Sequence, residues 1–467
     1  MAQITSSGIG SGLDISGLVS QLVQAERTPQ ETRLNTNEIR AQSRLSAFGG
    51  LKSSLSSFQG ALTKLQEAGL YQGRVASVSD EALFKVSADS DAAVGSYSIQ
   101  AEKLASRHKL ASVAFINDDA AIGTGTLSIS VNGKSFSVDI ATGSDSLTSV
   151  RDAVNSASDN GVTASIIREQ NGSRLVFTAA ETGAANAITI TASVDGSDTG
   201  DLTQLNFDPE GLPADNKLLE QQAAADAELT IDGFTAVSPN NVFSSVVDGV
   251  TITLLDTNPG VSESLDVNLD TDAVRNAVTQ FVNAYNTLRT NLNNLTAYDP
   301  ETGKAGLLQG DSTTSRLSNQ LRQMLNETVS GADADLDTLA EIGITTNFET
   351  GRLETDSDKL NGLIASNFDD FAALFSGDNG IAARLDAVAD VYTRFEGILD
   401  TRTDGLQKQI DRISDQRIML DKRLAVIEAR YLQQFTALDA LLGELNQTSS
   451  FLTSQLANLP GFTREKK

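Results

Sequence analysis

Apolar residues recur at helical spacing near both ends of the chain. The first apolar face starts after Asp14, a suitable N-cap, and runs to Pro29, where a helix is expected to break. Its members are Ile15, Leu18, Leu22 and Ala25. Two further runs, over 51–65 and 274–295, step by alternating intervals of four and three residues. Such intervals are typical of helices that pack along a narrow seam, so these runs predict one helical bundle within the chain.

The longest seam lies near the C-terminal end, over residues 406–452. Its apolar members are Leu406, Ile410, Ile413, Leu420, Leu424, Ile427, Tyr431, Leu438, Leu441, Leu445 and Leu452; its polar members are Arg417, Gln434 and Thr448. At 1.5 Å per residue it would form about 70 Å of helix, more than one small bundle can cover. We therefore favour assembly with other subunits for this seam, and packing inside the chain is the alternative.

The charges that flank this seam favour one direction of self-pairing. With Ile410 and Ile413 at the two apolar heptad positions, Arg423 of one copy faces Glu428 of a parallel copy. In an antiparallel pair arginine would face arginine and acid would face acid. Any self-association of 406–452 is therefore predicted to be parallel, each exposed pair adding about 0.2–1 kcal/mol.

Between about residues 76 and 270 the pattern changes to a period of two, which is typical of strands. Alternating segments at 127–131 and 136–140 flank Asn132-Gly133, a signal for a type I′ hairpin turn. The other predicted elements are strands at 165–168, 174–178, 187–191, 227–231 and 249–255, a helix at 147–156, and turns at Asp232-Gly233 and Asp248-Gly249. The predicted fold is α+β: a long helical, coiled-coil leg formed by both chain ends, with an inserted β-rich head of two small domains.

The β-rich region is also the most acidic part of the sequence. It contains nine Lys and Arg against 28 Asp and Glu, in a chain whose formal net charge is −26. This balance opposes binding to the phosphates of nucleic acid. A strongly acidic unit between two helical ends predicts that the ends pack together and that the β-rich part projects away from them.

Composition excludes several kinds of chemistry. The 467 residues include no cysteine and no tryptophan, which rules out disulfides, thiol catalysis and thiolate zinc sites. No apolar run approaches the 18 residues of a membrane helix, so membrane insertion is not predicted. Residues 1–20 carry no Lys or Arg, unlike an ordinary secretory signal.

Two local patterns resemble small-molecule sites but lack an essential part. The glycine-rich segment 8–12 follows no predicted strand and does not have the dinucleotide-binding spacing. The single histidine, His108, lies between Arg107 and Lys109, which predicts an exposed side chain without a role.

Two acidic clusters are candidates for a calcium site or for catalysis by paired carboxylates. Asp333, Asp335 and Asp337 begin like a calcium loop, but Thr338 and Ile344 stand where a glycine and a bidentate glutamate are required. The acids at 195, 198 and 201 have no loop spacing, and chance pairing of carboxylates is expected in so acidic a chain. We predict no catalytic residue, no metal site and no cofactor.

Several longer motifs occur in a fixed order along the chain. They are 8–14 (GIGSGLD) followed by Leu18-Val19, Leu22-Val23 and Glu26; 95–100 (GSYSIQ) with Leu104-Ala105; 281–288 (FVNAYNTL) with 308–311 (LQGD); and 343–360 with 430–439 (RYLQQFTALD). Together they resemble the conserved blocks of the flagellar filament cap proteins, the FliD family. The similarity covers both ends and most of the chain, and it is weakest over 110–225.

The resemblance implies a structural cap at the distal tip of the flagellar filament, and not an enzyme. The cap would be a ring-shaped homo-oligomer that promotes insertion and polymerisation of exported flagellin and prevents its loss. Export would use the flagellar type III apparatus, which places the protein outside the cell at the flagellum tip. The implied partners are other copies of the chain, flagellin, the hook–filament junction protein and a cytoplasmic export chaperone that binds the C-terminal segment.

The expected assembly and partner-binding residues lie on the two apolar faces near the chain ends. They are Ile15, Leu18, Leu22, Leu406, Ile410, Ile413, Leu420, Leu424, Ile427, Tyr431, Phe435, Leu438, Leu441 and Leu445. The expected domains are 1–40, an N-terminal helix or disordered export segment; 41–75 with 271–405, the leg; 76–110 with 191–270, the inner head; 111–190, the outer head; and 406–467, the C-terminal coiled coil.

Three other functions remain open from the sequence. Flagellin and the hook–filament junction protein share coiled termini with the cap proteins, although the block at 343–360 argues against both. An adhesin could bind host glycan or mucin through the acidic head, with or without capping. An enzyme with a carboxylate pair in the head is the third alternative.

Overall fold

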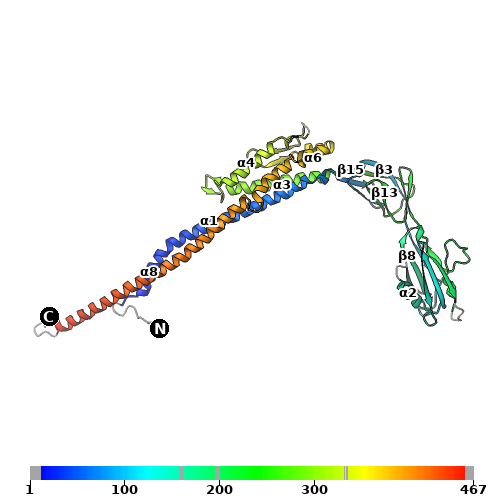
Figure 1. Cartoon of the computed structure of the whole chain (residues 1–467), viewed down its shortest axis with the longest axis horizontal. Coiled ribbons are helices and arrows are strands. Elements are labelled where there is room, and N and C mark those ends of the chain that lie inside the picture. Colours follow the sequence, from blue (N-terminus) through cyan, green and yellow to red (C-terminus); the bar gives the residue numbers. More distant parts are fainter. Residues whose placement is uncertain (1–11, 158–160, 195–199, 331, 333–334, 458–467) are drawn as a thin grey trace, which may run out of the picture. The chain divides into compact units, whose positions relative to one another are not determined.

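The computed structural model describes residues 12–157, 161–194, 200–330, 332 and 335–457 (Figure 1). The chain divides into two compact units, one comprising residues up to 68 together with those from 274 onward, and the other comprising 69–273. We call the first unit the leg and the second the head. The predicted α+β class, with helices from both ends of the chain and a β-rich insertion, is confirmed.

The leg is built mainly from helices that come from both ends of the sequence. Its described helices are α1 (Ile15–Gln66), α3 (Thr271–Thr296), α4 (Ser312–Asn326), α5 (Ser357–Ser366), α6 (Phe368–Phe375), α7 (Ile381–Thr393) and α8 (Ile398–Ala457). Two short hairpins, β16 (Tyr298–Asp299) with β17 (Lys304–Ala305) and β18 (Ile344–Thr346) with β19 (Leu353–Thr355), complete it. Asp14 caps α1 as predicted, its Oδ1 accepting the Gly17 N–H at 2.9 Å.

The helix break expected at Pro29 does not occur. Helix α1 continues without interruption from Ile15 to Gln66 and contains Pro29 in its interior. Proline has no backbone N–H to donate within a helix, and the sequence predicted a break at residue 29 for that reason. Here α1 lies beside α8 through this region, and the burial of apolar residues such as Leu34 of α1 and Leu424 of α8 offsets that local cost.

The core of the leg is an aromatic cluster where α1, α3 and α6 meet. The Phe58 ring of α1 lies 5.9 Å from the Phe281 ring and 5.8 Å from the Tyr285 ring, both on α3. Phe281 in turn lies 6.2 Å from Phe375 of α6. All four side chains are buried. The predicted seams at 51–65 and 274–295 therefore pack against each other inside the chain, as expected.

One buried carboxylate connects three helices of the leg. Asp311 caps α4, its Oδ1 accepting the Thr313 N–H at 2.9 Å. Its Oδ2 lies 3.3 Å from Nη2 of Arg44 on α1 and also accepts a hydrogen bond from Arg402 on α8. Burial alone would raise the pKa of Asp311, but the hydrogen bonds from Arg402 and Thr313 outweigh it and lower the pKa. The Arg402 guanidinium also lies 5.7 Å from the centre of the Phe48 ring.

The head contains two hydrophobic cores enclosed by antiparallel sheets. The first core lies under the five-stranded sheet β1-β15-β3-β11-β12 and the three-stranded sheet β13-β14-β2. The bounds of these strands are β1 (Arg74–Val78), β2 (Phe84–Ala88), β3 (Gly95–Lys103), β11 (Ala227–Ile231), β12 (Phe234–Ser238), β13 (Val242–Val247), β14 (Val250–Leu254) and β15 (Glu263–Leu269).

The second head core lies among the sheets β10-β4-β8-β7 and β6-β5-β9 and the helix α2 (Leu147–Ser156). Its strands are β4 (Arg107–Ala111), β5 (Gly125–Val131), β6 (Lys134–Ile140), β7 (Val162–Glu169), β8 (Gly172–Thr182), β9 (Thr189–Val194) and β10 (Leu219–Gln222). In the described residues, short 3₁₀ helices lie between α1 and β1 (η1, Ala68–Tyr71), between β8 and β9 (η2, Ala184–Asn186) and between β9 and β10 (η3, Leu202–Leu205).

Turn chemistry predicted from the sequence agrees with the backbone. Asn132 and Gly133 join β5 to β6 with φ of 50° and 70°, as a type I′ turn requires. Asp232 and Gly233 join β11 to β12 in the same way, with φ of 48° and 83°. Glycine and short polar residues tolerate these positive values, so the two hairpins follow directly from local sequence.

The division between the two head cores differs from the expected boundary at 190/191. Ile190, Leu202, Leu205, Phe207 and Leu218 all belong to the core that also contains residues 110–188. The first core resumes only at Ala227. Period-two patterning located the strands but carried no information on which core each strand covers.

A fragment of residues 69–273 is expected to fold alone, because both head cores lie within it. Calorimetry of this fragment should show cooperative unfolding at a temperature close to that of the head transition in the full chain. A soluble fragment without a cooperative transition would contradict the unit boundaries.

Candidate assembly surface

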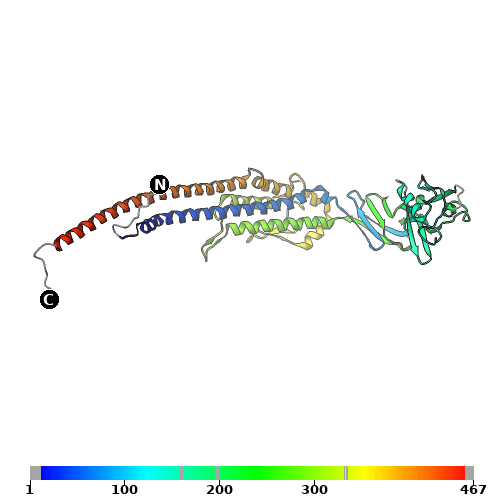
Figure 2. The ribbon, with the colours of Figure 1, turned by 90° about the horizontal axis from the view of Figure 1, so that it is seen from below.

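Helices α1 and α8 run side by side and antiparallel (Figures 1 and 2). Nη2 of Arg27 lies 2.9 Å from Oδ1 of Asp421, and the Tyr431 hydroxyl donates to Oε1 of Glu26 at 2.9 Å. The bond to Glu26 raises the pKa of Tyr431, because the carboxylate accepts the hydroxyl proton. These paired contacts fix the register of the two helices along the seam.

Arg417, one of the polar members of the predicted seam, adds a third register contact. Its guanidinium pairs with the Glu38 carboxylate and donates to Oδ1 of Asn35, both on α1. A polar group at a seam position lowers stability but allows only one alignment of the partners. Because α1 occupies this stretch of α8, packing inside the chain, the alternative left open by the sequence, is the arrangement found for it.

The predicted assembly residues separate into two groups according to exposure. Those buried or half-buried on their own helices are Ile15, Leu406, Ile410, Ile413, Leu420, Leu424, Ile427, Tyr431 and Phe435. The exposed ones are Leu18, Leu22, Leu438, Leu441 and Leu445, whose side chains are 38–56 % exposed. Only the second group is available to another molecule in this structure.

The buried face of α8 changes register near its C-terminal end. Up to Tyr431 the inward positions follow the predicted heptad. After Tyr431 the next inward positions are Phe435, Asp439 and Leu442, at successive steps of four, four and three residues. Steps of four keep Phe435 in the seam and leave the amide of Gln434 exposed, while Asp439 takes an inward position. This shift rotates the predicted positions 438, 441 and 445 toward the outside.

Helix α8 continues beyond the start of α1 (Figures 1 and 2). The Tyr431–Glu26 contact places Ile15, the first residue of α1, opposite about residue 442, because antiparallel helices advance equally per residue. The rest of α8, to Ala457, carries exposed leucines at helical spacing, which continue the outward-facing Leu438 and Leu441 of the stretch beside α1. We call Leu438, Leu441, Leu445, Leu452 and Leu456 the terminal stripe.

Two exposed apolar residues, Leu456 within this stripe and Phe451 near it, were missed from the sequence. Phe451 and Leu456 are about 60 % exposed, yet neither lies on the predicted seam. Continuing the four-step spacing from Leu452 would have found Leu456, whereas no periodic signal marks Phe451. Leu18 and Leu22 add apolar surface on the N-terminal turns of α1, where Val19 occupies the buried position instead.

The prediction that His108 is exposed is wrong. Its side chain is fully buried, and its ring lies 5.5 Å from the Phe207 ring. On a strand successive residues point to opposite faces, so charged neighbours at 107 and 109 place His108 on the inner face together with Leu110.

In the part of the chain that the structure describes, the other candidate patterns of the sequence form no catalytic or metal-binding site. Asp201 caps η3 through the Thr203 N–H at 3.0 Å, and the Asp337 N–H donates to Glu341 at 2.9 Å. Residues 8–11, Asp195, Asp198 and Asp333 lie outside the described residues. Within the described ranges, no group of three or more His, Asp and Glu side chains is placed to hold a metal ion. None of the described helices is both long and apolar enough to cross a bilayer.

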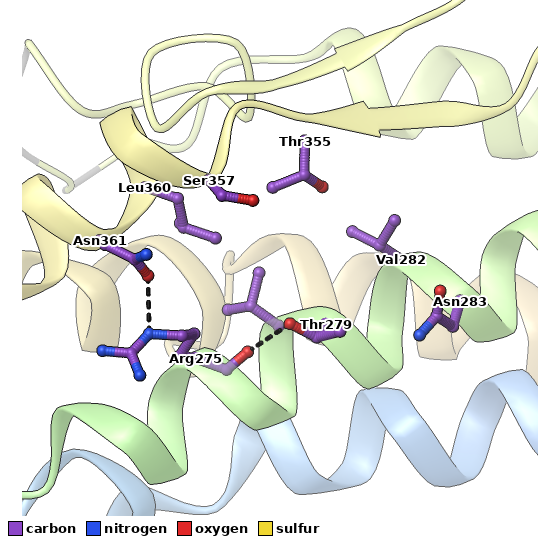
Figure 3. A pocket seen from close by; sticks show the side chains of 9 residues that line it. Arg275, Thr279, Val282, Asn283, Thr355, Ser357, Leu360 and Asn361 are labelled. Atoms are coloured by element: carbon purple, nitrogen blue, oxygen red, sulfur yellow. Dashed lines mark hydrogen bonds between the residues drawn. The ribbon is translucent and has the colours of Figure 1, made fainter.

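A pocket of about 270 Å³ lies between α3 and the β19–α5 segment of the leg (Figure 3). Two hydrogen bonds join residues that line it. Nε of Arg275 donates to Oδ1 of Asn361 at 2.6 Å, and the Thr279 hydroxyl donates to the Arg275 carbonyl at 2.8 Å. The remaining lining residues are Val278, Val282, Asn283, Thr355, Ser357 and Leu360. This lining offers no carboxylate or imidazole, so it provides no acid–base pair for catalysis.

Known families match this chain along most of its length. Residues 11–108 match the family described as flagellar hook-associated protein 2 N-terminus, and residues 224–447 match its C-terminus counterpart. Residues 126–181 match the flagellin hook IN motif, which falls within the second head core.

Full-length relatives and a solved structure agree with these matches. The chain is 36 % identical to an A-type flagellar hook-associated protein 2 of Pseudomonas aeruginosa, covering 99 % of both chains. It is 34 % identical to the flagellar hook-associated protein 2 of Escherichia coli K12, covering 98 % of this chain and 99 % of that one. It superposes on the D1-D2-D3 domains of the E. coli flagellar cap protein FliD with a TM-score of 0.59 and 33 % identity, covering 77 % of this chain and 99 % of the other.

These matches do not favour flagellin, a junction protein or an adhesin as the main function. The family forms an oligomeric cap on the flagellin filament, outside the cell. The order of motifs, the two-ended helical leg and the inserted two-core head all agree with that assignment. The chain belongs to the flagellar hook-associated protein 2 (FliD) family and is a flagellar filament cap protein.

Proposed function

We propose that this protein caps the filament through the terminal stripe, which contacts neighbouring subunits and incoming flagellin at the distal tip. One observation carries the proposal: Leu438 and Leu441 face away from α1, and the leucines of α8 beyond about residue 442, where α1 no longer lies beside it, also stay exposed. Exposed apolar side chains that recur along one side of a helix are typical of a protein contact. Leu18 and Leu22 would extend the same contact from α1.

The size of this surface suits a cap that must move as the filament grows. Full burial of one leucine is worth about 1.5–3 kcal/mol, so a contact of a few leucines stays reversible. The register contacts along α1 and α8, such as Tyr431–Glu26, meanwhile keep the leg itself intact. Subunits can then exchange partners at the tip without unfolding.

The finer assignments rest on the same surface and on family membership. We propose that an export chaperone covers the C-terminal segment in the cytoplasm, since exposed leucines there would otherwise associate non-specifically. We further propose that the chain is exported through the flagellar type III apparatus and that it contacts the hook–filament junction protein. We propose that the protein acts by assembly and not by catalysis. The domains expected from the sequence are our proposal for its functional parts, with the second boundary between inner and outer head moved from 190/191 to the segment between Leu218 and Ala227.

Deletion of the gene is expected to leave short or absent filaments and unpolymerised flagellin in the medium. Immunoblotting of the culture supernatant, with complementation by the full chain as control, measures this leakage. Intact filaments together with loss of surface binding would instead support an adhesin and contradict the capping proposal.

A further inference from the structure

The only histidine of the sequence is held in a fixed protonation state within the second head core. Nδ1 of His108 accepts the backbone N–H of Ile188 at 2.8 Å. Its Nε2 lies 3.1 Å from Oε1 of Glu220 on β10. A nitrogen that accepts a hydrogen bond carries no proton, so the ring is neutral, with its proton on Nε2 facing Glu220.

Protonation is incompatible with this arrangement. In the imidazolium both ring nitrogens are donors, and Nδ1–H would then point at the Ile188 N–H. The buried Ile188 amide would lose its acceptor, which costs the desolvation of that group. The ring is fully buried and packs against Phe207, so a turn toward water would break that packing.

The ring also lies beside the place where the chain passes between the two head cores. Ala105 belongs to the first core and Leu110 to the second, with His108 between them. The adjacent Ser106 accepts the Gly183 N–H at 3.2 Å and bridges to Ala225. His108 therefore joins β4, the segment before β9, and the edge strand β10 at this crossing.

We propose that His108 is an acid-sensitive latch of the head: neutral, it holds β4, Ile188 and β10 together, and a second ring proton releases them. This device goes beyond capping and does not depend on the terminal stripe. It would loosen the second core at the crossing between the cores when the surroundings become acidic, while the leg stays folded.

The charged groups around the ring set the direction of the effect. Burial lowers the pKa of His108, and this outweighs Glu220, which acts in the opposite direction. Arg107 and Lys109 of the same strand are exposed, and the other packed segments present the Ile188 amide and the Phe207 ring. Since the released state takes up a proton near pH 6.5 and the latched state does so only at lower pH, acid favours release.

Amide hydrogen exchange in the full chain tests the latch directly, using selective ¹⁵N-isoleucine and ¹⁵N-alanine labelling. Below about pH 6.5 the protection of the Ile188 amide, corrected for intrinsic exchange, should fall by up to about tenfold per pH unit. The matched control is the Ala192 amide, which donates at 2.7 Å to Oδ1 of Asn206, an acceptor that does not titrate. Its protection should change much less over the same range.

Two further measurements keep the proposal falsifiable. The proton-shift titration of the single histidine should give a midpoint below 6.5. In His108→Gln, which cannot take up a proton, the Ile188 protection should lose its pH dependence, although we expect the variant to be less stable at every pH. A histidine midpoint at or above 6.5, or equal pH dependence at Ile188 and Ala192, would overturn the latch; the wild-type measurements decide this even where His108→Gln fails to fold.

Discussion

Replacing Leu441 and Leu445 together by aspartate is expected to abolish filament growth in cells that otherwise lack the protein. Both side chains are more than half exposed in the terminal stripe, so the leg itself should fold normally. Losing the burial of two leucines costs about 3–6 kcal/mol at the proposed contact, which weakens binding a hundredfold or more. Motility on soft agar and flagellin in the culture medium measure the result.

The matched control for this experiment is Val426→Asp. Val426 lies on the same helix and is 71 % exposed, but it points away from α1 within the paired stretch and is not part of the stripe. This variant introduces the same residue type at an exposed position of the same helix, with one added charge where the stripe variant has two, and it should retain motility. Equal loss of motility in both variants would indicate a general effect on α8 and would contradict a specific role for the stripe.

Asp311→Ala is expected to lower the free energy of unfolding of the leg by about 2–4 kcal/mol. The change removes the N-cap of α4 and both arginine contacts, from Arg44 and from Arg402. Both arginines are partly exposed and can reach water, so the effect stays below that of a fully buried pair. Urea unfolding followed by far-UV circular dichroism of the full chain measures the difference.

A second capping aspartate separates the cap from the arginine contacts. Asp356 caps α5 through the Lys359 N–H at 3.1 Å but is exposed, so Asp356→Ala should cost only about 1 kcal/mol. Because the folded-state pKa of Asp311 is lowered, its contribution is fully present above about pH 4 and is lost as the pH falls through the folded value. Equal losses in the two variants, or a difference that grows in acid, would argue against the proposed three-helix contact.

Much of the fold could be predicted because local patterns determine it. The period-two segments around Asn132-Gly133 fix both strands and their turn, since only a turn with positive φ joins them at that length. The heptad runs that contain Phe58 and Phe281 identified the aromatic core of the leg in the same way. These features depend on neighbours in sequence, where spacing alone carries the information.

The failures have a common cause, which is long-range packing. Pro29 lies inside α1 because α8, almost 400 residues later, packs beside this helix. The predicted seam positions 438, 441 and 445 face outward because Phe435, and not Gln434, is the inward residue that follows Tyr431 on α8. The burial of His108 is the exception, because strand alternation between the charged residues 107 and 109, a local pattern, indicates it. The extent of the assembly surface therefore could not be predicted without knowing which residues of α8 are covered by α1.

Thiol footprinting tests the central claim most directly, because the chain contains no cysteine and an introduced one is the only reactive thiol. Leu445→Cys should react quickly with maleimide in the free protein and be protected when the protein is assembled on filaments. Ile413→Cys, buried against α1 within the chain, should react slowly in both states. Protection at Leu445 alone is the result that this structure predicts; fast reaction at Ile413 in the free protein and its protection on assembly, with Leu445 unchanged, would contradict it.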